Sequence, residues 1–418
     1  MFLRIERMLF GPLPEAVRRP AHIDLIAASC FGVFIAACLS FLPVVLRRLG
    51  ATTEMLALYI AFNYVGLLIS PLGMRVLKRV PTLEFAVVSW TIGRGSLVLA
   101  LFAQRAEWLL ALTCVFWVCE SLPAPAYTRI MTSVYPREYR GRAMSGVRIG
   151  MALVIVLTTP LAGAMLDRVG SPIVFSIVAL FGIAAALLFQ SMPYVDAPAP
   201  ALAADAPRKH SGLWRVLRAD RTFALYLGTL VCYGLGGVMG AALYPVVQVN
   251  RLGLSYTDIG TLSLVQSVFW LAGYAFWGRV LDKRGAIWVL WVNMGLVAVV
   301  TATYIFADSI WTLLPAFIAQ GLVQGGFELG ATNANIELTR GEQVLEYAVL
   351  QNIAIGARGI VAPLIGSALV AAGVADTTVF TLATVLVLIS LAMMVPVYAA
   401  AGGASRGHVA RPASDASG

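Results

Sequence analysis

The sequence predicts an all-α membrane protein whose twelve transmembrane helices form two pseudo-symmetric six-helix bundles. Hydrophobic residues make up 60% of the 418 residues and charged residues 12%, and the mean hydropathy is +0.84. Soluble domains contain about 45–50% apolar and about 25% charged residues. Apolar stretches fill residues 22 to 398, with one sizeable polar interval near the middle. Because lipid offers no hydrogen-bond partner, each stretch must be a helix that satisfies its own backbone.

Each stretch is long enough to cross a hydrocarbon core of about 30 Å. The even number of spans places both termini on one side, and neither the tenth nor the eleventh span contains a convincing break. The predicted spans are 23–46, 54–73, 82–102, 108–134, 142–165, 172–192, 223–249, 257–280, 286–306, 310–337, 344–372 and 378–397.

The spans and the intervals between them predict five regions. Ala-Pro repeats followed by basic residues indicate a flexible linker, and the polar carboxyl-terminal residues indicate a disordered tail. The regions are a cytoplasmic amino-terminal segment (1–21), a first six-helix bundle (22–192), a cytoplasmic linker (193–221), a second six-helix bundle (222–398) and a disordered cytoplasmic tail (399–418).

Lysine and arginine predict the orientation in the membrane. Most of the 30 basic residues fall on the side of the termini and the linker, and the opposite side carries Arg47, Arg48, Arg105, Arg168 and Arg251. The positive-inside rule therefore predicts a multi-pass protein of the cytoplasmic (inner) membrane with both termini cytoplasmic. Topology and anionic lipid account for the net charge of +9, so we expect the lipid bilayer, and no nucleic acid, as a partner.

Histidines and cysteines are placed unfavourably for catalysis. His22, His210 and His408 fall at the edge of a span, in the linker and in the tail, and all five cysteines fall inside spans. No metal-ligand spacing, nucleophile–base pair or nucleotide-binding loop is present. We therefore expect no metal, no cofactor and no enzymatic activity. Transport of a small molecule and membrane sensing without transport are the function classes that remain.

The two halves resemble each other at regular offsets. Glu120 and Glu328 are separated by 208 positions, and Gly73 and Gly278, each followed by a Lys-Arg pair, by 205. Pro-Leu-Ala-Gly at 160–163 and Pro-Leu-Ile-Gly at 363–366 are separated by 203. Such an internal repeat is common in transporters, whose substrate sites lie near the midplane between the repeats.

The segment from Gly278 to Gly285 lies between the eighth and ninth spans and reads Gly-Arg-Val-Leu-Asp-Lys-Arg-Gly. Together with Arg140-Gly141-Arg142-Ala143, the twelve spans, the linker and the repeat, it makes residues 20–398 resemble the major facilitator superfamily. The segment fits that family's loop signature of glycine, three residues, aspartate, a basic residue, any residue and glycine. The resemblance implies a secondary transporter that works by alternating access.

The sequence departs from the family pattern in two places. In the first half, Leu77 replaces the aspartate of the loop signature, and the closing glycine is missing. In the fifth span, Thr158 and Thr159 precede Pro160 where the family's antiporter signature has glycines. The resemblance therefore implies one charged lock rather than two, and the fifth-span motif does not support antiport.

A conformational lock is predicted at the loop signature. The small Gly278 would allow a close approach to a neighbouring helix, and Asp282 can meet a helix amino terminus or an arginine such as Arg142. Lys283 and Arg284 would hold the loop in the cytoplasm. A solvated turn is the alternative, although it does not explain Asp282.

Five ionisable residues fall inside predicted spans and are candidates for a substrate and proton pathway: Arg94, Glu120, Arg129, Glu328 and Arg358. A charge at the centre of the bilayer is costly unless it is paired or hydrated. The alternative is structural pairing, of Glu120 with Arg94 or Arg129 and of Glu328 with Arg358.

Two polar or aromatic stripes add further candidates. Gln320, Gln324, Glu328 and Asn335 have spacings that place them on one face of the tenth span, and we expect this face to meet water or substrate. Tyr233 belongs to an aromatic and glycine stripe in the seventh span, for which core packing is an equal alternative.

The expected function is secondary active transport of a small molecule, coupled to protons, by a monomer. Export of amphipathic compounds is favoured, and uptake of a polar metabolite or organic anion by a symporter or facilitator is the alternative.

The predicted topology can be tested by chemical labelling. A cysteine introduced at Ala203, in the linker, should react only with thiol reagents that reach the cytoplasm, because the linker carries the positive charge of the inner face. Labelling of that cysteine by an impermeant reagent outside intact cells would contradict the orientation.

Overall fold

The computed structural model describes residues 10–11, 13–196, 217–218, 220–338 and 344–409. Within these residues every regular element is a helix, and twelve helical segments are long and apolar enough to cross a membrane. The predicted fold class, an all-α protein with twelve spans in two six-helix bundles, is confirmed. Most of the predicted linker, including Ala203, and residues 410–418 of the predicted tail lie outside the described residues.

Six spans form each half, and some are built from several helical pieces. In the first half the elements are α2 (Glu15–Phe34), η1 (Ile35–Leu39), α3 (Leu42–Arg48), α4 (Thr53–Val76), α5 (Thr82–Ser96), η2 (Leu97–Phe102), α6 (Ala106–Ser121), α7 (Ala124–Val134), α8 (Arg137–Val169) and α9 (Ser171–Phe189). In the second half they are α11 (Arg221–Met239), η3 (Ala241–Leu243), α12 (Tyr244–Val246), η4 (Val247–Arg251), α13 (Tyr256–Arg284), α14 (Ala286–Ile305), α15 (Ile310–Leu338), α16 (Val344–Ala371) and α17 (Asp376–Val409).

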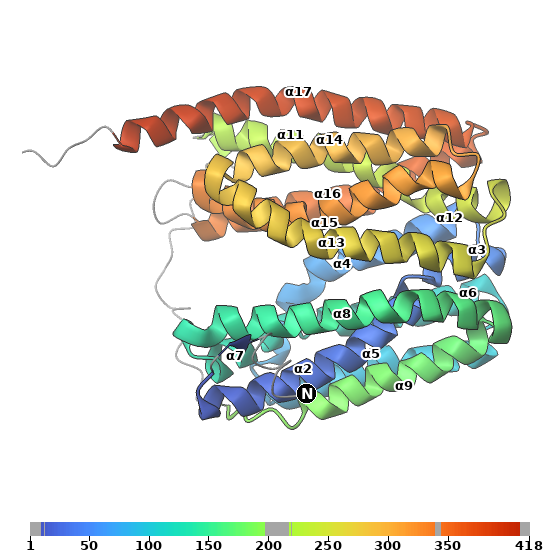
Figure 1. The fold of residues 1–418 in the computed structure, drawn as a ribbon, viewed down its shortest axis with the longest axis vertical. Helices are drawn as coiled ribbons and strands as arrows, with labels where there is room; N and C mark the ends of the chain where they lie inside the picture. Colours follow the sequence, from blue (N-terminus) through green and yellow to red (C-terminus); the bar gives the residue numbers. More distant parts are fainter. Residues whose placement is uncertain (1–9, 12, 197–216, 219, 339–343, 410–418) are drawn as a thin grey trace, which may run out of the picture.

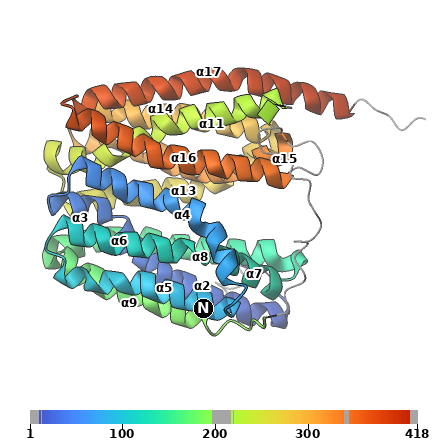
Figure 2. The same ribbon diagram turned by 180° about the vertical axis from the view of Figure 1, so that it is seen from behind.

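The spans run side by side between two ends of the molecule (Figures 1 and 2). In Figure 1 the first half occupies the lower part and the second half the upper part. We call the left-hand end in that view, where α9 ends and α11 begins, the linker end, and the opposite end the far end. Because the number of spans is even, α2 begins and α17 ends at the linker end.

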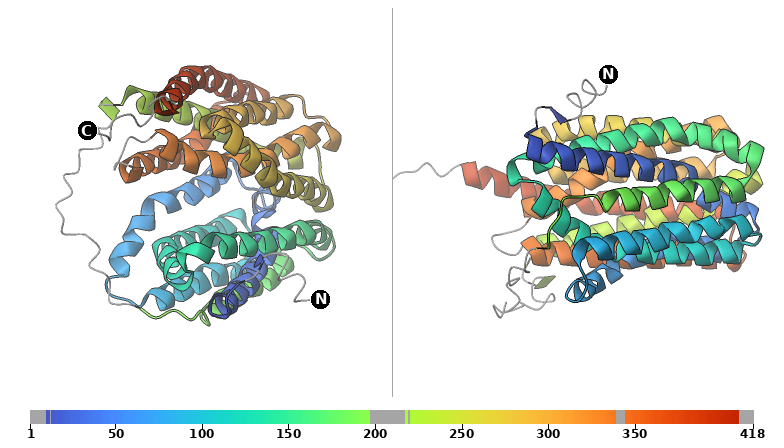
Figure 3. Two further views of the ribbon diagram at one scale, coloured as in Figure 1. Left: turned by 60° about the vertical axis from the view of Figure 1, so that its left-hand side comes forward. Right: turned by 90° about the horizontal axis from the view of Figure 1, so that it is seen from below.

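The halves meet along two pairs of helices. Within the first half α2 packs against α8 and α9, and within the second α15 packs against α13 and α14. Between the halves α8 packs against α13 and α4 against α16, and Figure 3 shows the two halves as separate groups with α4 between them. These pairs are the fifth span with the eighth and the second with the eleventh. The internal repeat therefore relates one pair to the other.

Prolines mark the places where spans are interrupted. Pro43 follows the π-helical turn η1 in the first span, and Pro245 precedes the π-helical turn η4 in the seventh. Proline lacks an N–H and clashes with the preceding turn, so a helix bends or stops near it. The two prolines are 202 positions apart, and both halves therefore distort their first span close to the far end. Pro123 separates α6 from α7 in the fourth span.

Two helix ends differ clearly from the predicted ones. α2 begins at Glu15, inside the predicted cytoplasmic amino-terminal segment (1–21), and it continues through Pro20. α17 continues to Val409 and so includes residues 399–409, which the sequence assigned to a disordered tail. Alanines at 399–401 favour helix, and the next proline is Pro412.

Candidate functional site

Arg94 and Glu120 form an ion pair within the first half. Arg94 Nη2 donates a hydrogen bond to Glu120 Oε1 at 2.8 Å, and Nε donates to Oε2 at 3.1 Å. Nη1 donates to the carbonyl of Gly182 at 3.3 Å, and the guanidinium lies over Phe31 and Trp90, at 4.0 and 5.1 Å from the ring centroids. A two-point pair of this kind is a strong interaction. Of the alternatives left open by the sequence, the structure shows Glu120 paired with Arg94.

Glu328 has a different environment. It lies on the exposed side of α15, and its carboxylate accepts a hydrogen bond from the hydroxyl of Tyr274 on α13. Among the described residues, Glu328 forms no ion pair with Arg358 or with any other cation. Tyrosine is neutral, so this carboxylate is hydrogen-bonded without forming an ion pair in the described part of the chain.

Arg358 on α16 is buried among aromatic rings. Its Nη1 donates to the carbonyl of Leu230 on α11, and its guanidinium lies 5.2 Å from the ring centroid of Tyr233 and 5.7 Å from that of Phe327. The side chain of Arg358 makes no ion pair with a described carboxylate, and its buried Nε has no hydrogen-bond partner. The structure thus brings Arg358 and Tyr233 together and leaves Glu328 apart from both.

The predicted polar row on α15 is partly exposed. Gln324, Glu328 and Thr332 are exposed and Gln320 is half-buried, whereas Asn335 is buried. The side chains of Gln320 and Gln324 form no hydrogen bond with the described residues. The row therefore provides amide and carboxylate groups along one side of the helix, and Asn335 departs from it.

Arg129 lies away from the other candidates. It is five positions before the end of α7, at the linker end, and close enough to Asp196 to interact with it electrostatically. Burial raises the pKa of the Asp196 carboxyl, but hydrogen bonds from the Thr82 hydroxyl (2.5 Å) and backbone N–H (2.9 Å) outweigh burial, and the pKa is lowered overall. Asp196 therefore binds the amino terminus of α5.

The residues predicted to form the conformational lock lie at the linker end, but Asp282 makes no locking contact in the described part of the chain. Asp282, Lys283 and Arg284 are exposed, and Asp282 forms no hydrogen bond or ion pair in the described part of the chain. Gly278 makes no close approach in this structure, because a Cβ there would meet no described atom within 4 Å. Its counterpart in the first half, Gly73, does pack tightly, against the carbonyl of Leu122.

Three polar residues near the candidates were not singled out as site residues by the sequence. Asp24 is 4% exposed and accepts a hydrogen bond from Tyr135 at 3.1 Å. Arg148 on α8 is near enough to both Tyr127 and Tyr274 for electrostatic interaction, so it faces the second half. Tyr274 is uncharged and does not stand out in a hydropathy profile, so the sequence alone could not identify it. Asp24 could have been identified, because an aspartate within an apolar helix is unusual.

Hydrogen bonds between described residues of the two halves gather at the far end. Asp167 on α8 accepts from the backbone N–H groups of Tyr256 and Thr257 at 3.0 and 2.7 Å, and from the Thr257 hydroxyl at 2.6 Å. Arg47 Nε donates to Asn250 at 2.8 Å, and Arg48 Nη2 donates to the carbonyl of Leu254 at 2.6 Å. Asp167 thus occupies the amino terminus of α13, where a negative charge is favourable.

Close backbone packing reinforces this closure. A Cβ on Gly163 of α8 would lie 2.5 Å from the carbonyl oxygen of Tyr256 and 3.3 Å from the Cα of Gly260. Only glycine permits α8 and α13 to approach so closely. In this structure the far end is closed.

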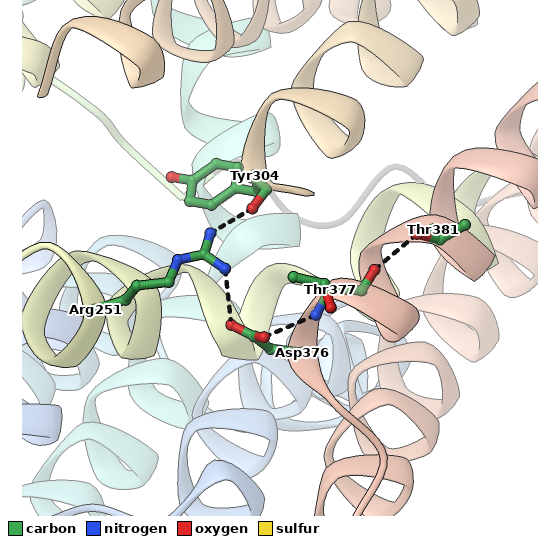
Figure 4. A network of polar contacts seen from close by, with 5 residues as sticks. All are labelled: Arg251, Tyr304, Asp376, Thr377 and Thr381. Carbon is green, nitrogen blue, oxygen red and sulfur yellow. Dashed lines mark hydrogen bonds and ion pairs between the residues drawn. The ribbon is translucent and has the colours of Figure 1, made fainter. Parts of the chain in front are cut away.

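An ion pair holds the far end of the second half together (Figure 4). Arg251 Nη1 lies 3.2 Å from Asp376 Oδ2, and Nη2 donates to the carbonyl of Tyr304 at 2.5 Å. Asp376 Oδ1 accepts in turn from the backbone N–H of Thr377 at 2.8 Å. The seventh, ninth and twelfth spans are joined here, so Asn250, the partner of Arg47, sits on a fixed support.

A groove of about 650 Å³ lies elsewhere, between α5 and α9. Its lining includes exposed apolar residues such as Val88, Ile92 and Leu187, and it contains none of the buried charges described above. In the described part of the chain no group of three or more His, Cys, Asp or Glu residues could hold a metal ion.

The sequence matches the family model of the Major Facilitator Superfamily over residues 25–302 and 225–415. The chain belongs to the major facilitator superfamily. It is therefore a multi-pass membrane transporter, and its buried charges lie within a transporter fold. No curated protein matches the sequence.

Solved structures share the superfamily fold at low sequence identity. The nucleoside transporter NupG is 12% identical with a TM-score of 0.67, and covers 92% of this chain and 99% of its own. A bacterial metal transporter is 14% identical with a TM-score of 0.65, at 92% and 99% coverage. A bacterial homologue of the human lysosomal transporter Spinster, in an inward-facing and unoccupied conformation, is 14% identical with a TM-score of 0.61, at 95% and 98% coverage. At these identities the similarity concerns the fold alone.

Loss of the Asp167 carboxylate should favour opening of the far end of this superfamily member. Removal of a helix cap costs about 0.5–2 kcal/mol, and since Asp167 is exposed, the lower part of that range applies. The expected change for Asp167→Ala is an increase of about two- to fivefold in the far-end-open population. Distances between spin labels at the far ends of α8 and α13 would measure it.

Asp308→Ala provides the matched control, since Asp308 is also an exposed far-end aspartate but its carboxylate contacts no residue of the first half. Equal distance distributions in the two variants would show that Asp167 does not hold the halves together.

Proposed function

We propose that this chain is a proton-coupled secondary active transporter that exports amphipathic small molecules by alternating access. The observation that supports proton coupling is the environment of Glu328, an acid within a membrane span that is bound by a neutral tyrosine and by no described cation. The function as a transporter follows from the superfamily, and the coupling ion, the direction and the substrate are proposals.

The two candidate acids have different capacities for proton exchange. Protonation of Glu120 would break its two-point pair with Arg94 and leave a buried arginine without an anion. Protonation of Glu328 breaks no ion pair, and it removes a charge whose presence inside a membrane span is costly. We therefore assign the proton to Glu328 and a structural role to Glu120.

Tyr274 positions the carboxylate during this exchange. Its hydroxyl donates to Glu328 when the acid is charged, and it can accept from the acid when Glu328 is protonated, because a hydroxyl both donates and accepts. Glu328 sits on α15 and Tyr274 on α13, and α13 packs against α8 of the other half. A change in the charge of Glu328 therefore acts next to the interface along which the halves would move.

Alternating access requires the linker end to close when the far end opens. The contacts at Asp167, Arg47 and Arg48 close the far end here, and Asp282 at the linker end has no described partner. We propose that Asp282 reaches the start of α8, near Arg142, in the opposite conformation. This matches the absence of the contact in a structure with a closed far end.

The proposed orientation places the linker end in the cytoplasm and the chain, as a monomer, in the inner membrane. Exposed basic residues at that end, among them Arg279, Lys283 and Arg284, support it through the positive-inside rule.

Export is proposed because the buried charge at Arg358 is surrounded by aromatic rings, which suits cargo with a large apolar part. Uptake of a polar metabolite or an organic anion is the second candidate, since the amides of Gln320 and Gln324 supply polar contacts along α15. Loaded vesicles with a proton gradient of either sign would distinguish the two directions.

Glu328→Gln should abolish proton-driven accumulation and retain downhill flux or exchange. Glutamine resembles the protonated acid in shape and charge, so binding persists while the variant cannot release a proton. The measurement is transport of the same substrate in proteoliposomes with and without an imposed proton gradient.

Glu138→Gln, which neutralises an exposed acid at the linker end, is the control and should behave as the native protein. Full gradient-driven accumulation by Glu328→Gln would remove the coupling role from Glu328.

Asp282→Asn should favour the linker-end-open state and slow transport. A charged contact with Arg142 or with the start of α8 is available only in the opposite conformation, and its loss should shift the equilibrium on the order of tenfold. Spin-label distances between the linker ends of α8 and α13 report the shift. Leu77→Asn, at the equivalent position of the first half, should change them little, and unaltered distances in Asp282→Asn would identify the aspartate as an ordinary loop residue.

A further inference from the structure

The chain contains two buried arginines in almost the same surroundings. Arg94 and Arg358 are 5% and 6% exposed. Each lies near two aromatic rings, Phe31 and Trp90 for Arg94 and Tyr233 and Phe327 for Arg358. Each also donates one hydrogen bond to a backbone carbonyl of a neighbouring helix.

The two arginines differ in one partner. The Nε and Nη2 groups of Arg94 are both used by the carboxylate of Glu120. The Nε of Arg358 is buried without a hydrogen-bond partner, and its Nη2 donates to no described residue. A guanidinium in a low-dielectric interior is costly unless an anion compensates it. The unused donors of Arg358 are therefore the same two groups that bind a carboxylate in the other half, and its Nε lies buried against Gly234 of α11.

The groups around Arg358 come from both halves of the protein. Leu230, Tyr233 and Gly234 belong to α11, and Phe327 belongs to α15. Tyr64 belongs to α4 in the first half and interacts electrostatically with the arginine. Its ring lies directly against Gly359, the next residue on α16.

Hydroxyl groups rather than carboxylates surround the guanidinium. Those of Tyr64, Tyr226 and Tyr233 are its electrostatic neighbours, and that of Tyr226 is engaged with Gln351 at 2.8 Å. The groups facing Arg358 therefore offer a positive charge, phenolic hydroxyls and apolar ring faces. Among the described residues, they include no negative charge that would attract a cation.

We propose that the transported substrate carries an anionic group, a carboxylate or a chemically similar oxyanion, and that Arg358 binds it in place of the missing protein carboxylate. Tyr64 contacts the same group from the first half, and the rings of Tyr233 and Phe327 pack against the apolar part of the substrate. This inference rests on the proposed transport function and specifies its substrate class. Since Arg358 and Tyr64 lie on opposite halves, a bound anion would bridge them.

Probes that share a carbon skeleton but differ in charge test whether the site prefers an anion. Binding of 2-naphthoate, decanoate and phenyl phosphate to the purified full-length protein would be measured by calorimetry and thermal stability, each beside the alcohol and the amine with the same carbon skeleton. At least one anion should bind more tightly than both of its matched compounds. Failure of all three anions to bind, or equal binding of an alcohol or amine, would overturn the proposal.

Variants locate the site. Arg358→Gln should weaken binding of the anion about 10- to 100-fold, as expected for loss of a charged hydrogen-bonding group, and should leave the alcohol unaffected. Arg358→Lys keeps the charge without the two-point geometry and should give an intermediate affinity. Arg279→Gln, which removes an exposed arginine of the same charge, should bind as the native protein does. If Arg358→Gln does not fold, the lysine variant and the native probe series still decide the question.

Two further measurements separate this inference from the transport proposal. Glu328→Gln should lose proton-driven accumulation and still bind the anion more tightly than its matched alcohol, because Glu328 does not contact Arg358. Binding that depends on Arg358 without flux in proteoliposomes would refute the transport proposal and keep the site. Proton-driven flux of a neutral compound that is unchanged in Arg358→Gln would refute the anion site and keep the transport proposal.

Discussion

A charged side chain within the hydrocarbon layer has no water to stabilise it, and this constraint governs the polar structure of the protein. Membrane-insertion scales give a free-energy cost of about 2.5–3.5 kcal/mol for a single charge at the centre of a spanning helix. Arg94 and Glu120 remove that cost by neutralising each other. Asp24 is stabilised by a tyrosine hydroxyl and Glu328 by another, while Arg358 has aromatic rings and one carbonyl. Glu328 and Arg358 are thus left without an ionic partner among the described residues, and they are the residues to which we assign proton exchange and anion binding.

The charged side chains that lack an ionic partner are distributed unevenly between the two halves. The repeat places an acid at corresponding positions in the fourth and tenth spans, yet Glu120 forms an ion pair with Arg94 and Glu328 forms none among the described residues. The helix pairs between the halves keep the symmetry of the repeat, since α8 with α13 and α4 with α16 are equivalent. The packing between the halves is thus symmetric, whereas the residues to which we assign proton exchange and anion binding both lie in the second half.

Hydropathy and charge were sufficient to predict the twelve spans and the two bundles, because membrane-spanning length and apolar composition leave few alternatives to helix. They were also sufficient to identify Arg94, Glu120, Glu328 and Arg358 as exceptional. They could not decide the pairing, which depends on how each helix is rotated about its axis: Arg94 turns toward Glu120, while Arg358 turns toward Tyr233 and away from Glu328. The role of Tyr274 could not be predicted, because a tyrosine within an apolar span is common. The contact at Asp167 could not be predicted for a different reason: it joins residues that are 89 and 90 positions apart and belong to opposite halves.

The amino terminus of α13 is capped twice, once from each half. Ser255 and Asp258 form a capping box within the second half, and Asp167 binds the N–H groups of Tyr256 and Thr257 from the first. If the halves separate, the internal cap remains and the helix keeps its first turn, so the two N–H groups lost by Asp167 become hydrated without any unwinding. Separation of the far end by rotation of one bundle against the other would therefore leave this helix intact. At this helix end the energetic cost of opening is limited to the contacts with Asp167, because the capping box does not involve the first half.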